Sequence, residues 1–322
     1  MGSRLVVVAA TALVFAFGSQ AWAFDLQAHR GGRGLLPENT LAAFENALAM
    51  GVTTLEMDVA ITSDGVAVIS HDPAMHAGLT RDAQGQWLKS TGPLIKNLTL
   101  AQVQSYDIGR PNPDHAYGKT YPQQQPRDGQ RIPTLAAVFQ RVKELGANDV
   151  QFDIETKVFP RRPNDTVTPE EFVRIMLAVI REAGVVDRVM IQSFDWRTLQ
   201  LFQAAEPRIR TMYLTIQNRN FYNATDPAWT AGRLHRDYPS VPHMIKAAGG
   251  TIWAMNFDSL DELAVKNAQA LGLKVMPWTV NEPTDMRRML DWKVDGIITD
   301  YPDRLRDVMR ERGMPLPVGI KP

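Results

Sequence analysis

The stretch His29–Asp72 reads HRGGRGLLPENTLAAFENALAMGVTTLEMDVAITSDGVAVISHD and carries the densest pattern in the chain. It holds four side chains that can titrate or bind a metal: His29, Glu56, Asp58 and His71. Strand-like and helix-like segments alternate around these groups, and a purely structural strand rarely carries so many charged residues. The stretch therefore predicts strands that end in a functional site, with the rest of the chain as the scaffold that holds it.

Outward from this stretch, short apolar segments alternate with helical patterns, which is typical of parallel strands with crossover helices. The predicted strands, most of which end in polar residues, are 24–29, 54–58, 150–155, 189–193, 211–215, 251–256, 274–279 and 296–299. Helices are predicted between them, among them 39–50, 134–145, 169–182 and 259–271. This α/β alternation predicts a (β/α)8 TIM barrel, in which functional side chains lie at the C-terminal ends of the strands.

A further apolar segment, residues 66–70, follows the strand of Glu56 after only four residues, TSDG at 62–65. Four residues are too few for a parallel crossover, and Asp-Gly is a hairpin signal, so the two segments are predicted to be antiparallel. A turn centred between Ser63 and Asp64 would place Glu56 roughly opposite His71. The hairpin is therefore expected to return His71 to the level of the carboxylates.

Two insertions interrupt the predicted barrel. Residues 73–132 are rich in Gly, Pro, Gln and Asn, and residues 217–238 are rich in Asn and aromatic side chains. The first is too long for an ordinary loop and is expected to form a small cap. Both insertions are expected at the mouth of the barrel, where their aromatic residues either shape substrate access or simply pack. We expect a single domain over residues 24–322 with both insertions inside it.

Charge and composition exclude several classes of function. The chain has 35 Lys plus Arg against 35 Asp plus Glu, so no basic excess favours nucleic acid or an anionic membrane surface. Recognition of a phosphate must therefore come from a few placed cations. The chain contains no cysteine, which excludes disulfides, thiolate metal sites and a cysteine nucleophile. The oligomeric state is not predicted.

The N-terminus has the pattern of an export signal. Arg4 is followed by the apolar run 5–17 and by the small-x-small site Ala21-Trp22-Ala23. We expect residues 1–23 to be removed and the mature protein to be periplasmic or secreted. The alternative is a retained N-terminal anchor. No later stretch is long and apolar enough to span a bilayer, so stable membrane insertion is not expected.

The carboxylates predict a metal site. Glu56 and Asp58 lie on one face of their strand, and Asp153 and Glu155 repeat this spacing at the end of another. A barrel brings these strand ends together, where a divalent cation would relieve the repulsion between the carboxylates. Oxygen ligands favour Mg²⁺ or Ca²⁺ over Zn²⁺. The alternative is that the carboxylates form solvated strand ends or salt bridges to neighbouring cations such as Lys157.

Two histidines and two cations complete the candidate site. His29 and His71 both follow strands, and imidazoles that face one carboxylate cluster are suited to act as an acid–base pair. Arg30 and Lys157 are the cations placed to hold a phosphate oxygen, Arg30 through its forked donors. Glu38 and Asn39 precede a predicted helix, where Asn39 is expected to act as the cap.

The motifs, taken in order, resemble the glycerophosphodiester phosphodiesterase family, which is similar to phosphatidylinositol-specific phospholipases C. The resemblance covers residues 28 to about 305. It rests on HRG at His29, ENT at Glu38, ExD at Glu56, TxDG at Thr62, HD at His71, ExK at Glu155, SF at Ser193, WTVN at Trp278 and DGIITDYP at Asp295. Asp153, where a neutral residue is expected, and Thr156, where an apolar one is expected, depart from the pattern without removing a required group.

The resemblance implies metal-dependent hydrolysis of glycerophosphodiesters, such as glycerophosphocholine and glycerophosphoethanolamine, to glycerol 3-phosphate and an alcohol. The implied roles are catalysis for His29 and His71, metal binding for Glu56, Asp58 and Glu155, and substrate binding for Arg30, Lys157 and Trp278. The alternatives are a phospholipase D or C that acts on lysophospholipids or glycerophospholipids, and a binding protein without activity. The insertions, not the catalytic strands, would decide between the two enzymes.

Overall fold

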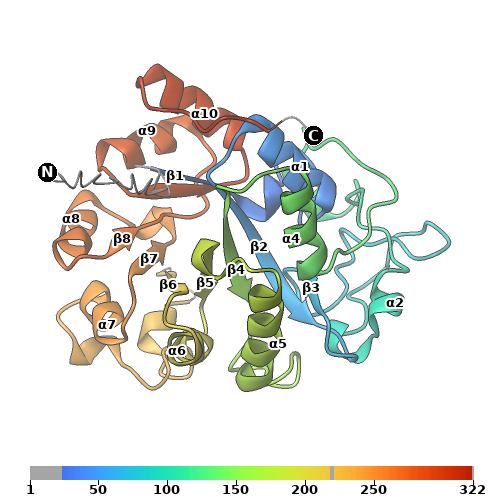
Figure 1. Cartoon of the computed structure of the whole chain (residues 1–322), viewed down its shortest axis with the longest axis horizontal. Helices are drawn as coiled ribbons and strands as arrows, with labels where there is room; N and C mark the ends of the chain where they lie inside the picture. The colour runs from blue at the N-terminus through green and yellow to red at the C-terminus, as the bar shows by residue number, and fades with distance from the viewer. Residues whose placement is uncertain (1–23, 218–220, 321–322) are drawn as a thin grey trace, which may run out of the picture.

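The computed structural model describes residues 24–217 and 221–320, and the predicted signal peptide over residues 1–23 lies outside them. Eight parallel strands run in the order β8-β7-β6-β5-β4-β2-β1-β9, with helices around them (Figure 1). They are β1 (Asp25–Ala28), β2 (Thr54–Ile61), β4 (Gln151–Thr156), β5 (Val189–Ser193), β6 (Arg210–Thr215), β7 (Ile252–Met255), β8 (Lys274–Val275) and β9 (Gly296–Thr299). The two ends of this strand order also meet. The backbone amide of Asp295, just before β9, donates to the carbonyl of Val275 in β8 at 3.0 Å. The predicted (β/α)8 TIM barrel is confirmed.

The predicted strand over residues 274–279 is wrong in its length, because β8 ends at Val275. Pro277 has no amide hydrogen, so it cannot donate to a ladder of strand hydrogen bonds. The chain nevertheless stays beside its neighbours. The Trp278 amide donates to the Met255 carbonyl at 3.1 Å, and the peptide bond between Trp278 and Thr279 is cis.

Helices cover the outside of the barrel, and threonines cap several of them. The longer helices are α1 (Leu41–Met50), α4 (Leu135–Glu144), α5 (Pro169–Glu182), α6 (Trp196–Ala205), α7 (Val241–Ala247), α8 (Glu262–Ala270), α9 (Pro283–Asp291) and α10 (Pro302–Glu311). The hydroxyl of Thr40 accepts the Ala43 amide at 3.1 Å and so begins α1. The prediction that Asn39 caps this helix is wrong, because the Asn39 side chain donates to Asp58 instead.

The predicted hairpin is present, with its register displaced by one residue. Strand β3 (Ala67–Ile69) runs antiparallel to β2, and Val59 pairs with Ile69. The backbone amide of Thr62 donates to the carbonyl of Val66 at 3.0 Å and closes the loop. Within the loop, Gly65 has a φ of 76°. A three-residue loop that ends in a left-handed glycine thus replaces the expected two-residue turn. The predicted register, which placed Glu56 roughly opposite His71, therefore differs from the observed one by one position.

The first insertion has structure of its own beside β2 and β3, where it includes α2 (Leu100–Val103) and α3 (Ala116–Thr120) (Figure 1). Its buried apolar side chains form a small cluster with Ala60 and Val68 of the hairpin, and comprise Met75, Ile95, Val103, Ile108 and Ile132. The insertion is thus anchored to the strands that carry the candidate site. In the part of the chain that the structure describes, no helix is long and apolar enough to cross a membrane.

The interior of the barrel divides into an apolar part and a polar part. Strands β5, β6, β7 and β9 and the residue after β8 contribute a buried cluster that comprises Met190, Met212, Leu214, Ile252, Ala254, Met276 and Ile298. Strands β2 and β4 contribute buried carboxylates, with Glu56 paired to Asp153 and Asp58 paired to Glu155 across the ladder. The carboxylates therefore converge because two neighbouring parallel strands carry acidic residues in the same alternation.

Candidate active site

The structure gathers three predicted metal ligands into one buried cluster. Glu56 and Asp58 have no exposed surface and Glu155 is 8 % exposed. One carboxylate oxygen from each of the three lies within 4.8 Å of the others. Two cations flank the cluster, with Lys157 Nζ 2.8 Å from Glu155 Oε1 and Arg30 Nε 3.2 Å from Asp58 Oδ2. Three carboxylates face two cations, so the cluster keeps one negative charge when all five groups are ionised.

Burial and neighbouring charges give these three carboxyl groups different pKa values. Burial, together with the charges of Asp58 and Asp153, raises the pKa of Glu56 well above its usual range. Burial also raises the pKa of Glu155 to about 7, although Lys157 opposes the shift. At Asp58 the cost of burial is outweighed by Arg30, which holds the pKa of this carboxyl well below its usual value. Without a cation, the cluster therefore retains protons at Glu56 and, below about pH 7, at Glu155.

These residues fit a hard divalent cation. The ligands are all carboxylate oxygens, which Mg²⁺ and Ca²⁺ prefer. The Oδ1 atom of Asp58 is buried without a hydrogen-bond partner, and a buried oxygen of this kind is satisfied when it coordinates a cation. The geometry agrees with the metal site predicted from Glu56, Asp58 and Glu155. Asp153 lies two residues before Glu155 on β4 and pairs with Glu56 across the ladder, and both its carboxylate oxygens are buried without a hydrogen-bond partner.

His29 lies directly after β1 and is oriented by a carboxylate that sequence reasoning missed. Its Nδ1 atom is 2.6 Å from Oδ1 of Asp300, and its Nε2 atom is 3.9 Å from Oε2 of Glu56. Because Asp300 occupies Nδ1, the neutral ring carries its proton there and leaves Nε2 free to accept one on the side of the cluster. Burial and the charge of Arg33 lower the pKa of His29 to about 4.

His71 is likewise oriented by an aspartate. Its Nδ1 atom lies 2.8 Å from Oδ1 of Asp72. Burial, together with the charges of Arg30 and Lys157, lowers the pKa of His71 to about 4. Both imidazoles are therefore neutral at pH 7 in this state and have a free Nε2 atom. A bound anion favours protonation of an imidazole, so substrate is expected to raise their pKa.

Arg30 is fixed from both its backbone and its side chain. Its φ of 51° is left-handed, and its amide donates to Glu56 Oε2 at 2.7 Å. Its Nη1 atom donates to Glu38 Oε1 at 2.9 Å. The Glu38 carboxylate also pairs with Arg33 and accepts the hydroxyl of Tyr117. Glu38 thus positions the guanidinium of Arg30, which is predicted to bind a phosphate oxygen.

Several polar residues that hold this site were not predicted. Asp300 also accepts Nε of Arg33 at 2.7 Å and Nδ2 of Asn281 at 2.8 Å. Gln192 on β5 donates to Glu56 Oε1 at 2.7 Å, and Asn39 donates to Asp58 Oδ2 at 3.0 Å. Asn281 lies in the WTVN motif and Asp300 in the DGIITDYP motif, so the sequence indicated these segments but not their contacts.

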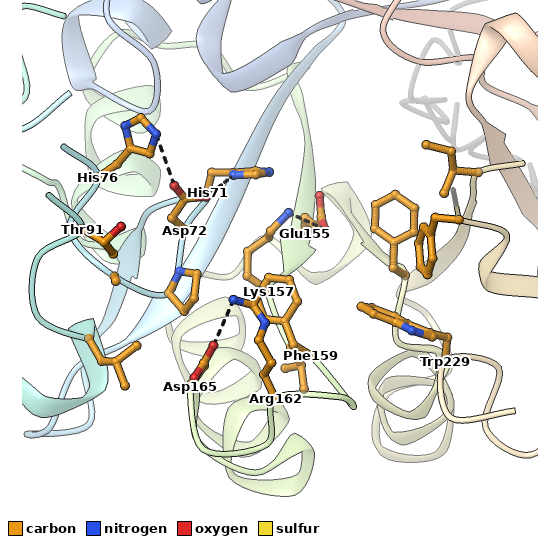
Figure 2. Close-up of a pocket in the computed structure, with 17 residues that line it drawn as sticks. His71, Asp72, His76, Thr91, Glu155, Lys157, Phe159, Arg162, Asp165 and Trp229 are labelled. Carbon is orange, nitrogen blue, oxygen red and sulfur yellow. Dashed lines mark hydrogen bonds and ion pairs between the residues drawn. The ribbon is translucent and has the colours of Figure 1, made fainter. Parts of the chain in front are cut away.

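Two connected cavities open onto these groups. An inner pocket of about 120 Å³ is lined by Trp278 and by the polar side chains His29, Arg30, Glu56, His71, Glu155 and Lys157. An outer cavity of about 570 Å³ shares His71, Glu155 and Lys157 with it and extends toward Trp229 (Figure 2). The structure thus brings every predicted site residue to one place, with Asp58 in contact with Arg30 and Lys157.

The chain is similar to known proteins over most of its length. The chain is 29 % identical over 288 residues to a glycerophosphodiester phosphodiesterase of Caldanaerobacter subterraneus, which covers 89 % of this chain and 98 % of that protein. It is 26 % identical over 295 residues to a lysophospholipase D of Mus musculus, which covers 87 % of this chain and 84 % of that protein.

A crystal structure from Silicibacter pomeroyi, provisionally named as a glycerophosphoryl diester phosphodiesterase, superimposes with a TM-score of 0.83 at 33 % identity. It covers 92 % of this chain and 96 % of that one. The sequence model of the glycerophosphoryl diester phosphodiesterase family matches residues 29–304, which span the barrel from His29 to the start of α10. The chain belongs to the glycerophosphoryl diester phosphodiesterase family.

Proposed function

We propose that the protein hydrolyses glycerophosphodiesters, such as glycerophosphocholine and glycerophosphoethanolamine, to glycerol 3-phosphate and an alcohol in a reaction that depends on one Ca²⁺ or Mg²⁺ ion. The observation that carries the proposal is the placement of two imidazoles, each oriented by an aspartate, around a buried cluster of three carboxylates. Both histidines line the same inner pocket as Glu56, Glu155 and Lys157.

The chain's own residues account for binding and orientation. Glu56, Asp58 and Glu155 would hold the cation, which supplies Lewis-acid polarisation of a phosphate oxygen when bound. Arg30 and Lys157 present positive charge to the remaining phosphate oxygens and offset the negative charge that develops there. Trp278 forms the apolar wall of the inner pocket, against which the carbon skeleton of a small substituent packs.

Proton transfer falls to the two histidines. The Nε2 atom of one imidazole accepts the proton of the attacking oxygen, which belongs either to water or to the 2-hydroxyl of the glycerol. The other imidazole, protonated when the anionic substrate is bound, gives its Nε2 proton to the oxygen of the departing alcohol as the phosphorus–oxygen bond breaks. The two aspartates stabilise each imidazolium as it forms and keep both Nε2 atoms aimed into the site.

The test is phosphorus NMR of glycerophosphocholine incubated with the protein and each cation. The proposal expects the diester signal to be replaced by that of glycerol 3-phosphate, and a transient cyclic phosphate would identify the 2-hydroxyl as the nucleophile. An unchanged diester signal with both ions would refute the proposed function.

We also propose that the protein is exported and that residues 1–23 are removed. The proposal rests on the N-terminal pattern of a basic residue, an apolar run and Ala21-Trp22-Ala23. Mass spectrometry of the protein from the periplasmic fraction of a bacterial host should give a chain that starts near Phe24. A full-length chain in the membrane fraction would instead indicate a retained anchor.

A further inference from the structure

Three aromatic side chains of the first insertion, His76, Tyr117 and Tyr121, form a row beside the candidate active site, called the insertion row below. The ring centroids of His76 and Tyr117 lie 5.6 Å apart, and those of the two tyrosines lie 5.4 Å apart. His115 packs edge-on against His76 with its centroid at 5.3 Å. The row is therefore one continuous chain of ring contacts.

Backbone contacts hold the insertion row in place. The carbonyl of Gly78 accepts the amide of Asn112 at 2.8 Å, which keeps the segment of His76 beside the start of α3. The amide of Gly78 donates to Nδ1 of His76 at 3.0 Å, and the amide of Tyr117 donates to Nδ1 of His115 at 3.1 Å. A side chain at Gly78 would collide with both imidazoles. The row is thus closely packed within the insertion.

The two tyrosines of the row donate to two carboxylates of the site. The hydroxyl of Tyr117 donates to Oε2 of Glu38, and the hydroxyl of Tyr121 donates to Oδ2 of Asp300 at 3.3 Å. Burial raises the pKa of both tyrosines above the usual value, so both hydroxyls keep their protons. Arg33 joins the two carboxylates, because its guanidinium pairs with both and lies 5.1 Å from the centre of the Tyr121 ring.

The imidazole of the row faces a third carboxylate. The Nε2 atom of His76 lies 3.9 Å from Oδ2 of Asp72 (Figure 2). Since the Gly78 amide donates to Nδ1, the neutral His76 ring carries its proton on Nε2, toward Asp72. The other oxygen of Asp72 contacts Nδ1 of His71.

The three carboxylates that contact the row are the same ones that orient the side chains predicted to act on the substrate: Asp300 orients His29, Asp72 orients His71 and Glu38 holds Arg30. Packing alone would need rings at these places but not the tyrosine hydroxyls. A buried carboxylate that loses a donor is left with an unsatisfied oxygen and is free to turn toward another partner. The hydroxyls therefore restrain the carboxylates on which the orientation of the site depends.

We infer that the insertion row is a positioning element, which fixes the carboxylates that aim the two imidazoles and the guanidinium of Arg30 at the phosphate. Tyr121 acts through Asp300, and Tyr117 acts through Glu38. The inference rests on the proposed diesterase chemistry and adds to it the residues of the insertion that set the geometry of the same site.

The experiment measures kcat and KM for glycerophosphocholine in Tyr121→Phe and Tyr117→Phe, which keep the rings and remove only the hydroxyls. Tyr121→Phe should lower kcat by about five- to tenfold, the ratio that corresponds to one typical hydrogen bond, and leave KM unchanged. Tyr117→Phe should instead raise KM and the inhibition constant of inorganic phosphate by a similar factor, because it acts on Arg30. Tyr222→Phe is the matched control, since its ring also contacts an imidazole, with centroids 5.8 Å apart, and its hydroxyl lies 3.4 Å from Nδ1 of His235.

A double-mutant cycle separates positioning from a general effect on the fold. In Asp300→Asn the ionised carboxylate is gone, so adding Tyr121→Phe should lower kcat further by no more than about twofold. Full multiplication of the two single losses would overturn the inference, and so would wild-type kcat and KM in both phenylalanine variants. His76→Phe, which removes the contact to Asp72, is a third variant and should lower kcat without raising KM.

If the wild type hydrolyses no diester, the proposed function fails and the row is tested without turnover. Proton NMR should detect the Nδ1 proton between His29 and Asp300 as a strongly downfield resonance, because the two atoms that share it lie 2.6 Å apart. Tyr121→Phe should shift this resonance, and Tyr222→Phe should leave it unchanged. An unchanged resonance in Tyr121→Phe would refute the positioning role.

Discussion

The Nδ1 atom of His29 lies 2.6 Å from the Oδ1 atom of Asp300, although 271 residues separate the two in sequence. Strand β9 pairs in parallel with β1, and this pairing places the residue after β9 beside the residue after β1. Asp300 is buried, and Arg33 and Asn281 also hold it. The orientation of His29 is therefore set by the barrel as a whole and does not depend on a flexible surface contact.

Asp300→Asn should lower kcat by about 100-fold or more while KM changes little. The amide no longer stabilises an imidazolium and can favour the wrong tautomer of His29. Steady-state kinetics on glycerophosphocholine measures both constants. Asp307→Asn on α10 is the control, since the side chain of Asp307 is 67 % exposed. Wild-type kcat in Asp300→Asn would show that the contact is structural only.

The two histidines should be separable by the leaving group. His29→Ala and His71→Ala should each lose roughly 10²–10⁴-fold in turnover of glycerophosphocholine. With a p-nitrophenyl ester of glycerol phosphate, whose leaving group needs no proton, the variant that lacks the general acid should recover and the variant that lacks the base should not. Recovery of both variants, or of neither, would contradict the division of roles between the two imidazoles.

Glu56→Gln should abolish the stabilisation by cations without unfolding the protein. The pKa of Glu56 is raised well above its usual range, so its metal-free form is protonated and the amide resembles it. The new amide can donate to Gln192 Oε1, which is buried without a partner. Calorimetry should show a metal-free unfolding temperature close to that of the wild type and no increase with Ca²⁺ or Mg²⁺. An unchanged increase would remove Glu56 from the set of ligands.

Metal binding should strengthen as pH rises through about 7. The folded, metal-free protein raises the pKa of Glu155 from 4.5 to about 7, so this group stabilises the metal-free fold at low pH. That contribution is lost as pH rises from 4.5 toward the folded pKa of about 7, where the carboxylate becomes available to the cation. The difference in unfolding temperature with and without cation should therefore grow over this interval. A difference in unfolding temperature that stays constant with pH would contradict the raised pKa of Glu155.

Much of the barrel could be predicted because parallel strands and their helices carry local signals. The strands β5 and β9 and the helix α5 have the predicted bounds. The hairpin register was missed because the choice between a two-residue and a three-residue loop depends on the φ of Gly65, which Asp-Gly alone does not determine. Strand β8 was overextended because Pro277 interrupts the ladder despite its apolar neighbours.

The carboxylates and histidines of the site could be predicted because their sequence spacing places them at strand ends. Their orienting partners could not. Asp300 reaches His29 only because β9 pairs with β1, and Gln192 reaches Glu56 across the interior from β5. The outer cavity draws on both insertions and on the loop after β4, so its shape depends on tertiary packing that no local pattern specifies.

The most direct test of the central claim is the release of glycerol 3-phosphate from glycerophosphocholine by protein stripped of metal, before and after Ca²⁺ or Mg²⁺ is restored. The account predicts no release from the stripped protein and recovery with one of the two ions. Full activity of the stripped protein would contradict the metal role of Glu56, Asp58 and Glu155. No release under either ion would contradict the proposed reaction on this substrate.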